Sequence, residues 1–106
     1  MDFEDNIKRL ELELPNAANP VGAYVAARKV SNLLFISGQI SIDKNGKLIT
    51  GKIGKELNIE QGYEAAKRCG LSIIAQAKKA CGNDLSKIIS CIKLTGYVNS
   101  TNDFTE

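Results

Sequence analysis

The chain of 106 residues contains no histidine and no tryptophan. The lack of histidine excludes Ser-His and Cys-His catalytic pairs and histidine-ligated metal sites from these residues. Aromatic side chains are also scarce, with three Tyr and three Phe, which argues against a platform for stacking single-stranded nucleic acid. Any chemistry must therefore come from hydroxyls, thiols, carboxylates, amides, basic side chains or backbone groups.

A strong charge imbalance and a long apolar run are also missing. The net charge is +2, which is too small to argue for a nucleic acid or an anionic membrane as partner. No apolar run approaches the roughly 18 residues of a membrane span. The acidic start Met-Asp-Phe-Glu-Asp lacks the apolar core of a signal peptide. We therefore expect a single cytosolic domain over residues 1–106, with no membrane segment.

The three cysteines, Cys69, Cys81 and Cys91, show no Cys-x-x-Cys spacing. A thiol nucleophile needs a nearby base or a helix N-terminus to lower its pKa, and the sequence indicates neither. We interpret all three cysteines as small residues of the core.

The stretch Leu33–Ile42 is the centre of the chain, because four consecutive apolar residues predict a buried strand. Ser37 and Gly38 then interrupt the apolar pattern. A glycine inside a strand marks a bulge or a close approach by another backbone or a ligand. Two interpretations follow: a bulged core strand whose Ser37 bonds to a neighbouring backbone, or the floor of a pocket where Ser37 and the Gly38 N–H meet a ligand.

Residues 23–30 predict a strand before this stretch, and Ser31-Asn32 is a short polar break between the two. An antiparallel hairpin is the expected result. In such a hairpin Tyr24, at the start of the first strand, lies near the far end of the second, around residues 37–40. An aromatic residue that merely covers the sheet edge is the alternative for Tyr24.

The strongest helix signal covers residues 59–81. Asn58 and Gln61 have the spacing of a capping box, and Gly82 is placed to end the helix. An apolar stripe at helical spacing predicts the face that packs on the sheet: Ile59, Tyr63, Ala66, Cys69, Ile73, Ala77 and Cys81. We expect the basic residues Lys67, Arg68, Lys78 and Lys79 to be solvated.

The remaining segments complete an α+β pattern. Residues 2–14 predict a helix with an uncertain end, residues 47–50 a short strand after the Asn45-Gly46 turn, and residues 87–98 another strand. Ser100 and Asp103 resemble the start of a further helix. Because a single long helix covers one face of the sheet, we expect another layer on the other face, most simply a second copy of the chain.

Several motifs together resemble the RidA/YjgF family, in the branch with an additional N-terminal segment and a Gly-Lys-Leu loop. The likeness runs from about residue 15 to the last residue. The motifs are Pro20-x-Gly22-x-Tyr24-Val25, Asn32-Leu33-Leu34-Phe35-Ile36-Ser37-Gly38-Gln39-Ile40, Gly62-Tyr63-x-Ala65-Ala66, Lys93-x-Thr95-Gly96-Tyr97-Val98-Asn99 and Asp103-Phe104.

The resemblance implies a chorismate-mutase-like α+β fold, with a mixed sheet covered on one face by a long helix. It implies homotrimers with ligand clefts between subunits and no metal or organic cofactor. Active members hydrolyse reactive enamine or imine intermediates to keto acids and ammonia, and others are named translation inhibitors or endoribonucleases. The C-terminal helix and closing strands of the family are expected to be missing from the 106 residues.

By the same resemblance, Tyr24 and Ser37 are the candidate catalytic residues, and Gly38 and Asn102 border a small carboxylate or imine ligand. Neutral hydroxyls can position a water molecule and move protons. In active members, an Arg and a Glu that act on the substrate lie beyond the position of Glu106. We therefore expect the 106 residues of this chain alone to be inactive. Either a fragment or a natural short form explains this. A non-catalytic ligand-binding trimer is the alternative function, and RNA cleavage has little support in the sequence.

Overall fold

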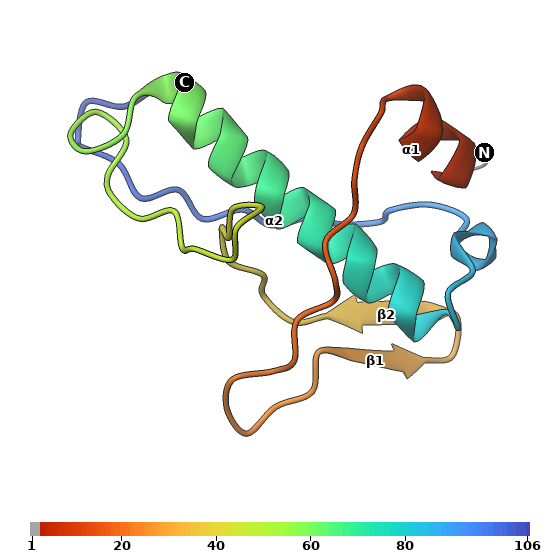
Figure 1. Cartoon of the computed structure of the whole chain (residues 1–106). Helices are drawn as coiled ribbons and strands as arrows, with labels where there is room; N and C mark the ends of the chain where they lie inside the picture. Colours follow the sequence, from red (N-terminus) through yellow and green to blue (C-terminus); the bar gives the residue numbers. More distant parts are fainter. Residues whose placement is uncertain (1–2) are drawn as a thin grey trace.

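The computed structural model describes residues 3–106 and has the expected α+β arrangement (Figure 1). Its elements in chain order are α1 (Phe3–Arg9), β1 (Ala27–Val30), β2 (Leu33–Ile36), α2 (Ile59–Ala80) and the short 3₁₀ helix η1 (Leu85–Lys87). Within this part of the chain, no helix combines the length and the apolar character that crossing a bilayer requires.

Helix α1 is shorter than the predicted 2–14, of which Met1 and Asp2 lie outside the described residues. It ends because Glu11 adopts a left-handed backbone conformation with φ 54°. The N–H of Leu12 then turns back to the oxygen of Ile7 at 3.0 Å. Residues 10 and 11 therefore form a turn, and only residues 12–14 of the alternating stretch continue beyond it, without regular structure.

The predicted hairpin is confirmed, but its strands are short. β1 and β2 pair antiparallel around the turn Ser31-Asn32, with Val30 opposite Leu33. Residues 23–26 and 37–42 were predicted to lie in these strands and do not. The last ladder-type bond runs from the Ser37 N–H to the Ala26 oxygen at 2.9 Å. From there side-chain bonds take over: the Ser37 hydroxyl donates to the Val25 oxygen, and the Gln39 amide donates to the Ser37 oxygen, which a further ladder bond would use.

Helix α2 confirms the sequence prediction at both ends. The Asn58 side chain accepts from the Gln61 N–H, and the Gln61 side chain accepts from the Asn58 N–H, both at 2.8 Å. Satisfying these donors stabilises the first turn. At the other end Cys81 is the C-cap, and Gly82 has φ 66°, a conformation that suits glycine.

Helix α2 lies across one face of the hairpin and contacts both strands (Figure 1). Its most buried residues are Leu71, Ala75, Gln76 and Ala77. The predicted stripe is thus only partly correct, since Tyr63 is 66% exposed. The opposite face of the hairpin exposes Val30, Leu33 and Phe35, so the described residues leave that face without a second layer.

The predicted strand 87–98 is not present as a strand. The chain first forms η1 and then continues without regular structure to a single parallel bridge between Ser100 and Ile53. A strand requires a hydrogen-bonding neighbour, and the described residues provide none alongside this segment. Its apolar side chains are accordingly exposed, including Ile89 at 90% and Tyr97 at 94%.

Two smaller predictions also need correction. Residues 47–50 form no strand, but a single antiparallel bridge joins Leu48 to Ile42. Ser100 starts no helix, because the chain turns at residues 102–103 and the Thr101 hydroxyl donates to Asp103 Oδ1 at 2.7 Å.

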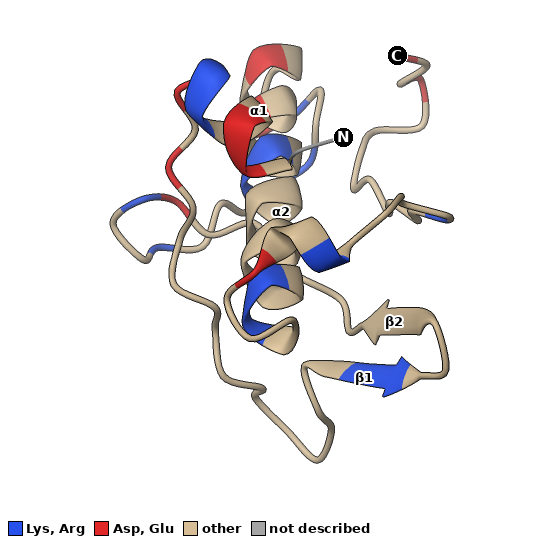
Figure 2. Ribbon diagram, turned by 90° about the vertical axis from the view of Figure 1, so that its right-hand side faces the viewer, with Lys and Arg blue, Asp and Glu red and all other residues tan. Residues whose placement is uncertain are grey.

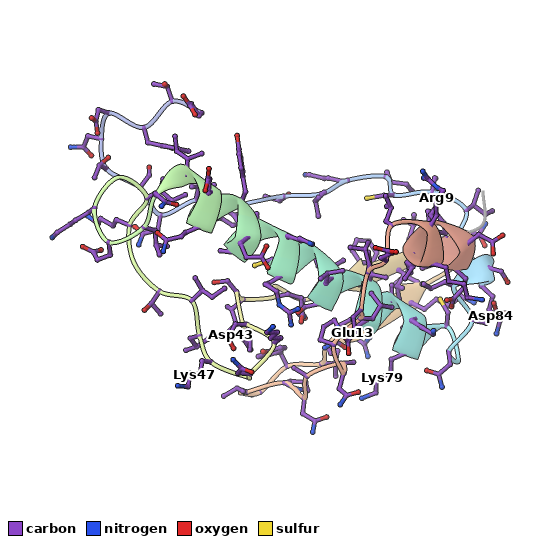
Figure 3. The ribbon with its side chains drawn as sticks, turned by 45° about the horizontal axis from the view of Figure 1, so that its top comes forward. Arg9, Glu13, Asp43, Lys47, Lys79 and Asp84 are labelled. Carbon is purple, nitrogen blue, oxygen red and sulfur yellow. The ribbon has the colours of Figure 1, made fainter. Side chains whose placement is uncertain are left out.

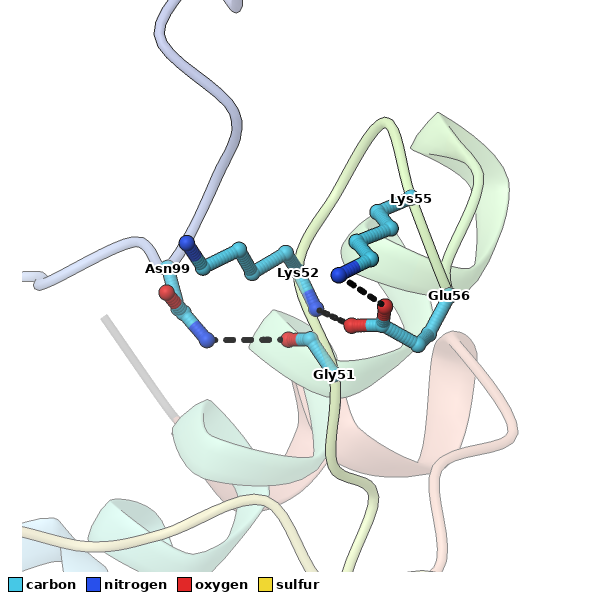
Figure 4. A network of polar contacts seen from close by, with 5 residues as sticks. All are labelled: Gly51, Lys52, Lys55, Glu56 and Asn99. Atoms are coloured by element: carbon cyan, nitrogen blue, oxygen red, sulfur yellow. Dashed lines mark hydrogen bonds and ion pairs between the residues drawn. The ribbon is translucent and has the colours of Figure 1, made fainter.

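A compact loop over residues 51–57 joins the start of α2 to the last segment of the chain (Figure 4). The Lys52 N–H donates to Glu56 Oε1 at 2.9 Å, and Asn99 Nδ2 donates to the Gly51 oxygen at 3.2 Å. The backbone of Ile53 bonds on both sides, to the Asn99 oxygen and from the Thr101 N–H. This loop therefore fixes where residues 99–101 lie.

Candidate functional site

Ser37 stands where the hairpin ladder ends. Its N–H donates to the Ala26 oxygen at 2.9 Å, and its hydroxyl donates to the Val25 oxygen at 2.6 Å. Because a carbonyl can only accept, the hydroxyl proton is committed to Val25. The lone pairs of Ser37 Oγ remain able to accept a hydrogen bond from a water molecule or a ligand.

Tyr24 lies one residue before Val25, at the open end of the hairpin. The side chain is 50% exposed, and the ring lies against the backbone of Gly22, whose φ is 138°. Its hydroxyl oxygen accepts a long hydrogen bond of 3.4 Å from the Val21 N–H. The hydroxyl proton is therefore free to be donated, which complements the accepting role of Ser37.

Gly38 follows Ser37 and borders open space. No other part of the described chain lies within 4 Å of the position a Cβ would take. The close approach anticipated at this glycine is therefore not made within one chain. Of the two interpretations of this stretch, the bond from Ser37 to a neighbouring backbone is present, and the space beside Gly38 also leaves room for a ligand.

Asn102 lies apart from the other candidate residues within one chain. It sits in the turn after Thr101, whose N–H bonds to the Ile53 oxygen. This C-terminal segment lies beside the beginning of α2, well separated from the hairpin in both Figure 1 and Figure 2. The fold thus brings the backbone next to Tyr24 into contact with Ser37, but a single chain does not bring Asn102 to them.

Two polar residues of α2 escaped the sequence interpretation. Arg68 was expected to be solvated, yet it is partly buried, and its Nε donates to the Ile42 oxygen at 2.7 Å. Gln76 is only 2% exposed and its Nε2 donates to the Ala18 oxygen at 2.7 Å. The signal for Gln76 was present, since an amide between Ala75 and Ala77 is out of place on an apolar face.

The loop after Ile42 is ordered by Asp43, which lies next to Lys47 (Figure 3). Asp43 Oδ1 accepts the N–H groups of Asn45 and Lys47 at 2.8 and 2.9 Å. The Lys47 N–H is the main reason that the pKa of Asp43 lies below its ordinary value, and the charge of Arg68 adds a smaller effect. Asp43 is therefore a structural carboxylate that stays ionised, and it is not a proton donor at neutral pH.

Two open hollows lie elsewhere on the surface. The first, about 580 Å³, is bordered by Ile53, Phe104 and three carboxylates, Glu60, Asp103 and Glu106. These charges would repel an anionic ligand. The second, about 510 Å³, lies between residues 14–17 and the last turns of α2. Neither hollow includes any of the candidate site residues.

The cysteines and acidic residues offer no second chemical centre. Cys69 and Cys81 are partly buried, and Cys91 is exposed, which corrects its placement in the core. Burial raises the pKa of the Cys69 thiol, so the reactive thiolate is disfavoured. Across residues 3–106, no group of three or more Cys, Asp or Glu side chains is placed to bind a metal ion.

The fold is that of known proteins. The crystal structure of the protein Atu1372 from Agrobacterium tumefaciens, of unknown function, superimposes with a TM-score of 0.81 at 38% sequence identity. The match covers 96% of this chain and 60% of that one. The chain therefore has the chorismate-mutase-like α+β fold.

Residues 4–106 match the family model described as "YjgF/chorismate_mutase-like, putative endoribonuclease". The chain thus belongs to the RidA/YjgF family, whose relatives include proteins named RutC. Protein TCP17 of Trypanosoma cruzi is 37% identical over 95% of this chain and 62% of its own length. RutC family protein PH0854 of Pyrococcus horikoshii is 36% identical over 86% of this chain and 63% of its own length. The chain therefore spans about three-fifths of the length of these relatives.

Proposed function

We propose that this domain provides the ligand site of a cytosolic enzyme that hydrolyses reactive enamine or imine intermediates to keto acids and ammonia. The observation that supports this proposal is that Tyr24 and Ser37, whose hydroxyls have complementary hydrogen-bonding roles, both lie at the open end of the hairpin, where Gly38 borders open space. Ser37 Oγ is an acceptor because its proton is held by Val25, and the Tyr24 hydroxyl is a donor.

These roles fit the hydrolysis of a carbon–nitrogen double bond. Water adds to the carbon while the nitrogen takes a proton, and the C–N bond of the resulting carbinolamine then breaks to release ammonia and a keto group. Ser37 would accept a hydrogen bond from the attacking water, and Tyr24 would donate one to the nitrogen. An enamine reaches the same intermediate after protonation at carbon.

A homotrimer with clefts between subunits completes the proposal. The candidate residues line neither of the two hollows, and the outer face of the hairpin exposes Val30, Leu33 and Phe35. Apolar patches of this kind are typical of subunit interfaces. A neighbouring subunit would cover this face, and its Asn102 would complete the ligand site that Tyr24, Ser37 and Gly38 begin.

A non-catalytic ligand-binding trimer is the second candidate. The four candidate residues are all neutral, and Arg28, which lies opposite Phe35 in the hairpin, is not one of them. A guanidinium would be needed to pair firmly with a substrate carboxylate. We therefore assign turnover to a full-length form with the Arg and Glu of active members, and ligand binding alone to these 106 residues.

RNA cleavage, the activity in the family description, receives less support. Figure 2 shows Lys and Arg interspersed with Asp and Glu along the helices and loops. With a net charge of +2 and no histidine, the chain lacks the usual electrostatic footprint for RNA.

The test is ammonia release from a freshly generated amino-acid-derived imine, measured for the full-length form and for the 106-residue chain. We expect the full-length form to accelerate release above the buffer rate and the shorter chain to leave it unchanged. Titration with pyruvate, a small 2-keto acid, distinguishes the second candidate. If pyruvate binds near Ser37 and the full-length form shows no turnover, the enzymatic function is rejected in favour of the ligand-binding function.

A further inference from the structure

Helix α2 holds the two irregular segments that lead to the candidate site, each through one side chain. Arg68 Nε reaches across 26 residues of sequence to the Ile42 oxygen, and Gln76 Nε2 reaches across 58 residues to the Ala18 oxygen, both at 2.7 Å. Buried or partly buried bonds of this kind are costly to leave unmade. They therefore fix the backbone at Ile42 and at Ala18 relative to the helix.

The two segments have few other restraints. Residues 15–26, which carry Tyr24, contain no regular structure, and the ladder of β2 ends before Ser37. Beyond the ladder, residues 37–42 are restrained near their two ends: Ser37 bonds to the Ala26 and Val25 oxygens, and Ser41 exchanges two bonds with Ile49, one through its oxygen and one through its hydroxyl. Without a continuous ladder, the position of such a segment depends on isolated anchors.

We propose that Arg68 and Gln76 are positioning residues for the candidate site. Arg68 fixes the position of residues 37–42, which form one wall of the site. Gln76 fixes the position of residues 15–24, which form the other wall. The part of this inference that concerns a ligand rests on the proposed function. Small displacements of such groups are known to weaken binding and turnover strongly, because productive geometry is narrow.

The test uses the variants Arg68→Met and Gln76→Met, which keep an apolar stem but remove the donor. Arg68→Lys is the conservative variant, since an ammonium can still donate to the Ile42 oxygen. Lys67→Met is the matched control, because Lys67 is an exposed residue of the same helix. Two readouts are taken: backbone ¹⁵N order parameters along the chain, and the dissociation constant of pyruvate from amide shifts.

We expect Arg68→Met to lower the order parameters of residues 38–43 and to leave those of residues 16–24 unchanged. Gln76→Met should lower the order parameters of residues 16–24 and leave those of residues 38–43 unchanged. Pyruvate affinity should fall about five- to tenfold in both variants, as the loss of one such hydrogen bond predicts. Arg68→Lys should recover part of the loss, and Lys67→Met should resemble the parent protein in both readouts.

The inference is wrong if the order parameters fall uniformly, if they do not change, or if pyruvate binds the loosened variants as it binds the parent. Failure of the proposed function has a different signature. In that case the parent protein does not bind pyruvate, while the segment-specific changes in order still decide whether Arg68 and Gln76 position the two walls.

Discussion

Ser37 Oγ lies 2.6 Å from the main-chain oxygen of Val25, the residue after Tyr24, and donates its proton to it. This bond lies just beyond the end of the hairpin ladder, orients the hydroxyl and leaves its lone pairs to accept. It also links the two candidate catalytic residues, since the backbone of the first strand continues directly from Val25 to Tyr24.

Replacing Ser37 by Ala should reduce ammonia release by the full-length form about 100-fold, the lower range for losing a proton-transfer group. The lost hydrogen bond should cost about 0.5–1.5 kcal/mol of unfolding free energy. Ser86→Ala is the control, because Ser86 also loses a hydroxyl bond, to Asp84, and is not one of the candidate site residues. Equal ammonia rates for the two variants would remove Ser37 from the mechanism.

Two glycines of α2 provide a matched test of packing. A Cβ at Gly70 would meet nothing within 4 Å, whereas a Cβ at Gly62 would lie 2.6 Å from Ile53 Cδ1. Gly70→Ala should therefore stabilise the helix by about 0.5–1 kcal/mol. Gly62→Ala should lose that gain because Ile53 must move.

Chemical denaturation of both variants measures the difference. An equal gain at both positions would show that the loop over residues 51–57 does not pack on α2 as described.

Local sequence signals predicted the elements that depend on nearby residues. The capping box of Asn58 and Gln61, the hairpin around Ser31-Asn32 and the turn at Gly82 each involve contacts within a few positions. Such contacts can be recognised from spacing alone. The resemblance motifs also placed the chain in its family, which the comparisons confirm.

The sequence could not predict the extent of the strands or the anchors of the irregular segments. Alternation over residues 87–98 indicated a strand, but a strand exists only where a neighbour pairs with it, and that depends on long-range contacts. For the same reason Arg68 looked like a solvated residue. Its partner, the backbone oxygen of Ile42, is a group that every residue possesses, so no pattern marks it.

The loop over residues 51–57 should depend on the absence of a side chain at Gly54. Its φ is 94°, and a Cβ there would lie 2.6 Å from Thr101 Oγ1. Gly54→Ala should thus cost about 1–3 kcal/mol through backbone strain and the clash. In Gly46→Ala, the control, φ is 82° but nothing lies within 4 Å, so only the strain remains.

Adding Thr101→Ala to Gly54→Ala removes the clash and should recover part of the loss in a double-mutant cycle. Purely additive unfolding free energies would contradict the close packing of Gly54 against Thr101.

The stability of the loop around Asp43 should depend on pH with a definite sign. The Lys47 N–H, together with that of Asn45, holds the pKa of Asp43 below its ordinary value. A carboxyl whose folded pKa is depressed contributes stability above its unfolded pKa and loses it as the pH falls through the folded pKa.

Asp43→Asn keeps an acceptor oxygen but does not titrate. The advantage of the parent protein over this variant in unfolding free energy should be constant near neutral pH and should shrink below about pH 4. An NMR titration of the Asp43 carboxyl gives its pKa directly. A pKa at or above the ordinary value would contradict the two N–H bonds.

The most direct measurement of the central claim is ammonia release from an amino-acid-derived imine by the full-length form and its Tyr24→Phe variant. The ring and its contact with Gly22 are retained in this variant, and the lost 3.4 Å bond is weak. We predict release above the buffer rate by the parent and a fall of about 100-fold in the variant, with pyruvate still bound. Release at the buffer rate by the parent, or equal rates for both proteins, would contradict the account.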